Sequence, residues 1–190
     1  LAGAGQSIRY SVNKAGQNKD WNKADLTAKF EEHVGTLSDV IAHIEQGFAV
    51  CAGVLKDGYR DSENFVQSEW VIIDIDHGWT IAEALQHQTV AHATLLYTTC
   101  SHRPGEEERF RIVFRLPQAI TDFELYESLI KVVLNEIPQH DPQCKDGVRI
   151  FYGNTGATFP LINDGGTLPG TYIERAKFRL EEKEQQLLNQ

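Results

Sequence analysis

Residues 70–78, with the sequence WVIIDIDHG, constrain the fold more than any other part of this chain. A continuous apolar run of this kind predicts a buried strand. The run ends in Asp74 and Asp76, and because side chains alternate along a strand, both carboxylates point to the same face. Two ionised carboxylates so close repel each other unless a cation lies between them, so the pair indicates a divalent-metal site. Asp-x-Asp is also a common pattern, and the other interpretation is a solvated strand end.

The composition is typical of one globular domain. The chain has 190 residues, which is long enough for a full core, and its 41% hydrophobic and 24% charged residues are near the globular averages. No stretch approaches the ~18 to 20 apolar residues of a membrane span. Three cysteines without C-x-x-C spacing argue against a disulfide framework or a zinc ribbon and suit a reducing compartment. We therefore expect a cytoplasmic protein without a membrane partner.

Charge is unevenly distributed along the chain. The net charge of −9 does not indicate a nucleic-acid binder, because such proteins usually carry a basic surface. Seven positive residues nevertheless gather between residues 100 and 149, namely Arg103, Arg109, Arg111, Arg115, Lys131, Lys145 and Arg149. The sequence is therefore compatible with a cationic cleft inside an acidic protein.

Helices and strands are expected to alternate irregularly. Residues 1–20 are polar and rich in glycine, and we expect a disordered or flexible lead-in there. The patterns predict helices at about 25–33, 37–46, 80–90 and 122–137, and strands at 48–55, 70–75, 94–99, 110–116 and 148–152. Residues 173–190 read as a charged C-terminal helix that leads towards a further module. A sheet with helices on one or both faces is the expected result.

Two further polar segments follow predicted strands. Residues 98–103, TTCSHR, form a small-residue turn that presents His102 beside Arg103 and suits an anionic group such as a phosphate. Residues 141–153, DPQCKDGVRIFYG, contain a turn with two carboxylates and a lysine, followed by a strand with an arginine. Each segment also has a plainer interpretation. Residues 98–103 could be a surface turn, and residues 141–153 could be a charged segment leading into a hairpin.

The order of the three segments resembles the archaeo-eukaryotic primase superfamily, specifically the primase-polymerase domains of plasmid and phage replication proteins. The acid pair matches the first motif of that family, h-D-h-D, and residues 100–102 match the second, small-x-His. Asp141 matches the lone acid of the third motif, and Arg149 matches the basic residue after it. The stretches RFRIVF and RDSENF are also similar to the plasmid and phage branch, and the resemblance spans roughly residues 55–155.

The resemblance implies an α+β (mixed α/β) primase-polymerase catalytic core over residues 21–172, with a central, mostly antiparallel sheet flanked by helices. Asp74, Asp76 and Asp141 would be the catalytic residues and the ligands of two Mg²⁺ or Mn²⁺ ions. Asp146 is the alternative third acid, although Asp141 stands at the turn after the predicted helix, as in the family pattern. The residues expected to bind the nucleotide are Ser101, His102, Arg149, Arg111, Lys145, Arg103 and Arg60.

The implied function is that of a template-directed nucleotidyltransferase, a DNA primase or primase-polymerase that synthesises or extends primers. Its expected partners are a single-stranded DNA template, a primer strand, NTP or dNTP, and a fused or associated helicase, and the isolated domain is expected to be monomeric. Two alternatives stay open. One is another metal-dependent Asp-x-Asp enzyme, a sugar-nucleotide transferase or a nuclease, and the other is a catalytically silent replication module that binds nucleic acid. No motif reports the choice between ribo- and deoxynucleotides.

Overall fold

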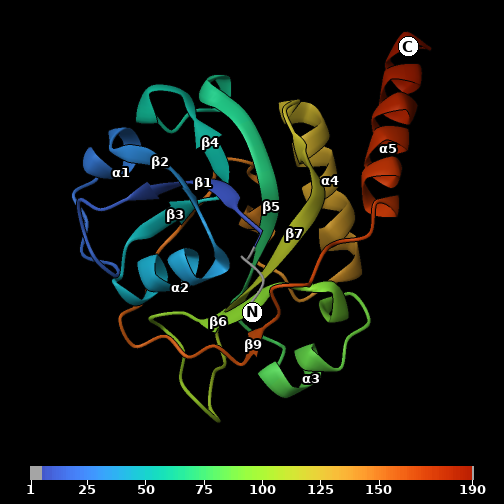
Figure 1. Cartoon of the computed structure of the whole chain (residues 1–190). Helices are drawn as coiled ribbons and strands as arrows, with labels where there is room; N and C mark the ends of the chain where they lie inside the picture. Colours follow the sequence, from blue (N-terminus) through green and yellow to red (C-terminus); the bar gives the residue numbers. More distant parts are fainter. Residues whose placement is uncertain (1–5, 190) are drawn as a thin grey trace.

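Two antiparallel sheets form the body of the protein in the computed structural model, which describes residues 6–189 (Figure 1). In spatial order, the first sheet contains β2 (Phe30–Gly35), β1 (Ile8–Asn13), β3 (Ala49–Cys51) and β8 (Ile150–Phe151). The second sheet contains β4 (Gly53–Leu55), β5 (Phe65–Ile75), β7 (Phe110–Ile120), β6 (Leu95–Thr98) and β9 (Leu161–Ile162). The α+β class and the antiparallel pairing are thus confirmed, with two sheets in place of one.

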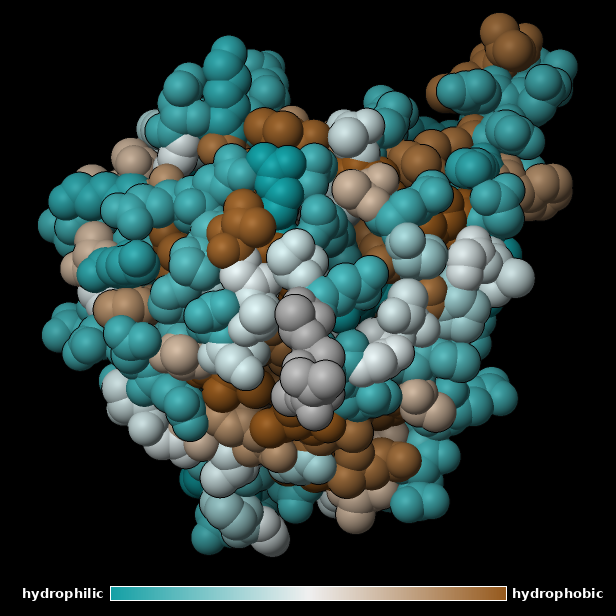
Figure 2. Space-filling model, viewed as in Figure 1, coloured by the Kyte–Doolittle hydropathy of each residue, from teal (hydrophilic) through white to brown (hydrophobic). Residues whose placement is uncertain are grey.

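Helices cover the outer faces of this body. The long helix α4 (Phe123–Glu136) packs against the second sheet, and α5 (Thr171–Leu188) packs beside α4 (Figure 1). The shorter helices are α1 (Asp25–Ala28), α2 (Leu37–Glu45) and α3 (Ile81–Leu85). The far end of α5 carries exposed leucines, visible as brown at its tip in Figure 2. Within the described residues, no helix has both the length and the apolar character needed to cross a bilayer.

The strand β5 separates two cores. Its residues Val71, Ile73 and Ile75 pack with α4 in one hydrophobic cluster, whereas Trp70 and Ile72 pack in a second cluster with residues of β1 and α2. Because side chains alternate along a strand, Asp74 lies on the same face as Trp70 and Ile72. Its carboxylate therefore belongs to the face between the two sheets. The acid pair therefore lies where the two layers meet.

The neighbouring strand β7 has the same division. Phe110, Ile112 and Phe114 belong to the core under α4, whereas Val113 belongs to the core between the sheets. Arg111 shares the face of Val113 and is the register partner of residue 74 on β5. The alternation predicted for residues 110–116 is therefore confirmed, and it brings a guanidinium opposite a carboxylate inside the protein.

The expectation of a flexible lead-in over residues 1–20 is wrong for Ile8–Asn13, which form β1 in the first sheet. The physical reason is the alternation of Ile8, Tyr10 and Val12, whose side chains are fully buried. The polar residues between them conceal this period-2 pattern. Residues 1–5 of the expected lead-in lie outside the described part of the chain.

Three predicted elements differ from the structure. The helix predicted for residues 25–33 ends at Ala28, because the following residues pair along the whole of β1 and form β2. The strand predicted for residues 48–55 is two strands, one in each sheet, so the chain changes layers at Ala52. The helix predicted for residues 80–90 ends at Leu85, although the Thr80 cap is present. Element ends are set by tertiary pairing more than by local preference.

A substitution in β5 tests the division of the core. Ile73→Ala removes a fully buried side chain and should lower the free energy of unfolding by about 2–5 kcal/mol. The matched change Val66→Ala on the same strand removes a side chain that is 42% exposed and should have little effect. Urea unfolding of both variants measures the difference. Equal losses would contradict the burial of Ile73 in the core under α4.

Candidate functional site

A cavity of about 300 Å³ opens between the two sheets at the end of the acid-bearing strand. Segments far apart in the sequence line it: the end of β5, the start of β7, the turn after β6, the segment before and within β8, and the loop after β1. The lining residues are Lys19, Asp74, Asp76, Thr99, Cys100, Ser101, Arg109, Arg111, Asp141, Gln143, Arg149, Ile150 and Tyr152. The cavity therefore combines three carboxylates with four cationic side chains.

The three carboxylates converge on one point. Oxygen atoms of Asp74, Asp76 and Asp141 lie within 4.8 Å of one another. The backbone fixes this meeting, because the Asp141 amide donates to the Asp74 carbonyl at 2.8 Å. Asp146 lies apart, with its carboxylate accepting from the Val148 amide at 3.0 Å. Of the two possible third acids, the geometry brings Asp141 to the pair.

Two arginines neutralise the most buried of these acids. The Nε of Arg111 lies 3.1 Å from Asp74 Oδ1, and Nη2 of Arg149 lies 3.2 Å from Asp74 Oδ2 and 2.5 Å from Asp141 Oδ2. Burial alone would lower the pKa of Arg111, but the Asp74 carboxylate and the Tyr97 phenol raise it above its ordinary value. Arg111 also donates to the Tyr152 carbonyl at 2.5 Å. Its guanidinium is thus a fixed positive charge that positions Asp74.

Cys144 contacts the backbone of the first acid, Asp74. Its Sγ lies 3.1 Å from the Asp74 amide, and its side chain is buried. Burial raises the pKa of the Cys144 thiol to about 12, so the group stays neutral near pH 7. Cys144 therefore contributes a hydrogen-bond acceptor to the site and no charge.

The donor set of the cavity fits a hard divalent cation. All three converging ligands are carboxylate oxygens, which Mg²⁺ and Mn²⁺ prefer. Arg149 bridges two of them, so a positive group already lies where the acids converge. Asp74, Asp76 and Asp141 are accordingly the residues that could hold a metal ion, as the sequence predicts.

The small-residue turn lies beside the acids. Ser101 lines the cavity, and the next residue, His102, has its Nδ1 accepting from the Arg109 amide at 3.1 Å. Because a backbone amide can only donate, Nδ1 is the acceptor and the ring proton belongs on Nε2. Cys100 joins the turn to the segment after β8 through Sγ–H donation to the Gly153 carbonyl, 3.2 Å away. The turn is therefore held in place and carries donors suited to an anion.

The seven predicted nucleotide ligands are divided by the structure. Ser101, Arg111 and Arg149 line the cavity, and His102, which is not a lining residue, directly follows Ser101 and contacts the backbone of the lining residue Arg109. The other three lie outside the lining. Arg103 is paired with Glu107, whose pKa falls to about 2 because of hydrogen bonds from Arg109 and Arg103. Lys145 is in the short helical turn Pro142–Lys145, and Arg60 Nη1 lies 3.4 Å from the Val148 carbonyl.

Two cationic residues of the cavity are absent from the predicted site. Arg109 lies with Nη1 3.9 Å from Asp76 Oδ1 and Nη2 2.8 Å from Glu107 Oε1. The sequence contained a signal for Arg109, because Arg109 immediately precedes the strand β7, on which Arg111 faces Asp74. No sequence signal pointed to Lys19, since it belongs to the segment expected to be a flexible lead-in. In the structure its Nζ lies 2.5 Å from Ser101 Oγ.

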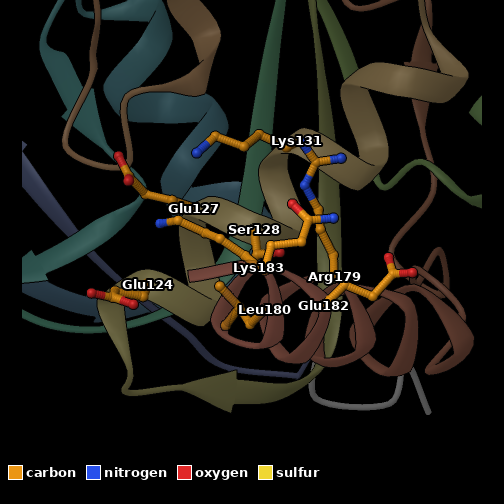
Figure 3. Close-up of a pocket in the computed structure, with 9 residues that line it drawn as sticks. Glu124, Glu127, Ser128, Lys131, Arg179, Leu180, Glu182 and Lys183 are labelled. Atoms are coloured by element: carbon orange, nitrogen blue, oxygen red, sulfur yellow. The ribbon is translucent and has the colours of Figure 1, made fainter. Parts of the chain in front are cut away.

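A larger hollow of about 550 Å³ lies between α4 and α5 (Figure 3). Figure 3 shows that acidic and basic side chains from the two helices are interleaved along it. The charged residues are Glu124, Glu127, Lys131, Arg179, Glu182 and Lys183. This mixture is typical of a solvated helix surface, and the converging carboxylates are found in the smaller cavity.

Two solved structures have folds similar to that of this chain. No protein-family model matches the sequence, and no curated protein does. Among solved structures, the chain is similar to the AEP domain of the primase-polymerase of cyanophage S-2L, with a TM-score of 0.51 and 11% identity over 90% of this chain and 89% of that one. It is also similar to the primase RepB′, with a TM-score of 0.56 and 12% identity over 96% of this chain and 61% of that one. The chain has an archaeo-eukaryotic primase-type fold.

A pair of arginine variants tests the buried ion network. Arg111→Met leaves the Asp74 carboxylate without one of its buried partners and should lower the free energy of unfolding by about 3–5 kcal/mol, measured without divalent ions. Arg103→Met removes an exposed ion pair and should change stability little. If both variants unfold at the urea concentration of the parent protein, the network does not stabilise the fold.

Proposed function

We propose that this chain is a template-directed nucleotidyltransferase, a DNA primase or primase-polymerase that uses two Mg²⁺ or Mn²⁺ ions. The observation that carries the proposal is the convergence of three carboxylates beside an anion-suited turn, in a fold shared with a primase-polymerase domain and the primase RepB′. A single-stranded DNA template, a primer strand and NTP or dNTP are the proposed partners. Association with a helicase and a monomeric state stay predictions.

Each group in the cavity has a proposed task. Asp74, Asp76 and Asp141 hold the divalent ions, which neutralise charge on the transferring phosphoryl group and on the leaving pyrophosphate when bound. Ser101 Oγ and the Nε2–H of His102 donate to the triphosphate. These groups act by positioning and by charge, with no covalent intermediate on the protein.

The arginines divide between two tasks. Arg111 is buried and shared between Asp74 and a carbonyl, so we assign it to positioning the acid, in place of the predicted phosphate contact. Arg149 lies at the convergence of the acids and adds positive charge beside the phosphates. Arg103, Lys145 and Arg60 stay predicted nucleotide ligands, although their contacts do not reach the cavity.

Extension of a labelled primer on a single-stranded template tests the proposal. The reaction contains Mn²⁺ or Mg²⁺ and either nucleotide set, and a lane without primer separates initiation from extension. Asp141→Asn should reduce product formation by more than about a hundredfold, because it removes a metal ligand. Asp146→Asn is the matched control, since it changes a carboxylate of the same segment outside the cluster and should retain activity.

Three results would contradict the proposal, and each would indicate a different function. Shortening of the primer would indicate a nuclease. Transfer of a nucleotide without any dependence on template would indicate another Asp-x-Asp transferase. Binding of DNA without turnover in any metal would indicate a silent replication module.

A further inference from the structure

The segment of residues 14–21, between β1 and α1, lies against the cavity and is firmly anchored there. Asn18 is its main anchor, with its amide donating to the Gly47 carbonyl at 2.7 Å. The Asn18 Oδ1 accepts from the Thr155 amide at 2.9 Å. Asn18 has a φ of +55°, a left-handed conformation in which asparagine is tolerated better than most residues. The segment is therefore fixed to two separate loops.

Trp21 adds a contact within the segment itself. Its Nε1 donates to the Asn18 carbonyl at 2.9 Å, and its ring lies 6.5 Å from that of Tyr152, a residue of the cavity lining. A Cβ at Gly16 would come within 2.7 Å of the Trp21 ring, so only glycine permits this packing. These contacts give the loop one defined shape beside the site.

Lys19 follows the anchor residue and reaches into the cavity. Its Nζ lies 2.5 Å from Ser101 Oγ, on the turn to which the nucleotide triphosphate is assigned above. The other three cations of the lining, Arg109, Arg111 and Arg149, each lie within 4.0 Å of a carboxylate. Among the described residues, Lys19 has no carboxylate within that distance, so its charge is not neutralised by the protein. An ammonium also has three donors, of which Ser101 uses one.

We propose that Lys19 binds the triphosphate of the incoming nucleotide together with Ser101, and that the segment 14–21 is a wall of the nucleotide site. This inference rests on the proposed function, which supplies the triphosphate. In the proposed reaction the acids would hold divalent ions, so the phosphates also need cationic donors that are not already paired with those acids. Lys19 is the cation that the ion network leaves available for them.

Direct titration with a nucleoside triphosphate tests this role at constant ionic strength, with Ca²⁺ in place of the catalytic ions. Lys19→Met should weaken triphosphate binding about tenfold, the loss expected for one charge-assisted hydrogen bond, and Lys19→Arg should restore most of it. Binding of the corresponding nucleoside, which has no phosphate, should not change between the proteins. Lys23→Met removes an exposed lysine of the following loop, outside the lining, and should bind like the parent protein.

Steady-state kinetics add a second readout. Lys19→Met should raise the KM for the nucleotide with little change in kcat, because the contact is made before and during the reaction. Asn18→Gly keeps the left-handed backbone accessible but removes the side-chain anchors of the loop, so it should raise the same KM. A fall in kcat alone, with KM unchanged, would overturn the assignment of Lys19 to substrate binding.

The outcomes separate this inference from the function on which it rests. If the parent protein binds triphosphate and Lys19→Met binds it equally well, the role of Lys19 is wrong and the proposed function stands. If Lys19→Met weakens binding of single-stranded DNA and leaves triphosphate binding intact, Lys19 contacts the template and the inference also fails. If the parent protein binds no nucleoside triphosphate, both proposals fall.

Discussion

Asp74 carries a negative charge that is almost fully buried between the two sheets, in the wall of the cavity, and the site depends on how that charge is held. Its side chain is only 7% exposed, and one guanidinium lies at each of its oxygens. Removing a charge from water is costly, and it is tolerated only where partners with good geometry replace the lost hydration. Arg111 comes from the neighbouring strand and Arg149 from just before β8 in the other sheet. The network therefore joins both layers at the point where Asp76 and Asp141 also arrive.

The same network gives the cavity its electrostatic character. A net charge of −9 describes the whole chain, yet four cations face three acids inside one cavity. Arginines hold the acids together without a metal, because Arg149 bridges two of them. Local arrangement therefore outweighs net charge as an indicator of which ligands such a protein accepts. The ions and phosphates of the proposed reaction would meet groups that are already in position.

Local patterns predict the parts of the site that lie on strands. Ser101 and Asp141, which lie in a turn and a loop, are predicted through the family resemblance, whereas Lys19 in another loop is missed. The apolar run before Asp74 and the alternation from Phe110 onwards predict strands and faces correctly, because period-2 patterns are local. The strand containing Tyr10 was missed, since its polar alternate residues resemble a loop. Lys19 could not be placed, because contacts of Asn18 with Gly47 and Thr155 position it, and such contacts join segments that are distant in sequence. Arg60 is also positioned by a contact distant in sequence, with the Val148 carbonyl, whereas Arg103 pairs with Glu107 only four residues along the chain.

Anomalous diffraction from crystals grown with Mn²⁺ and a non-hydrolysable nucleoside triphosphate tests the central claim most directly. We expect manganese bound by the carboxylates of Asp74, Asp76 and Asp141, with the triphosphate extending towards the turn that contains Ser101. The contradictory result is a cluster without manganese at saturating concentration, in which Arg149 still bridges Asp74 and Asp141. In that case the three acids and their arginines would form a structural ion network, and the cavity would not be a nucleotidyltransferase site.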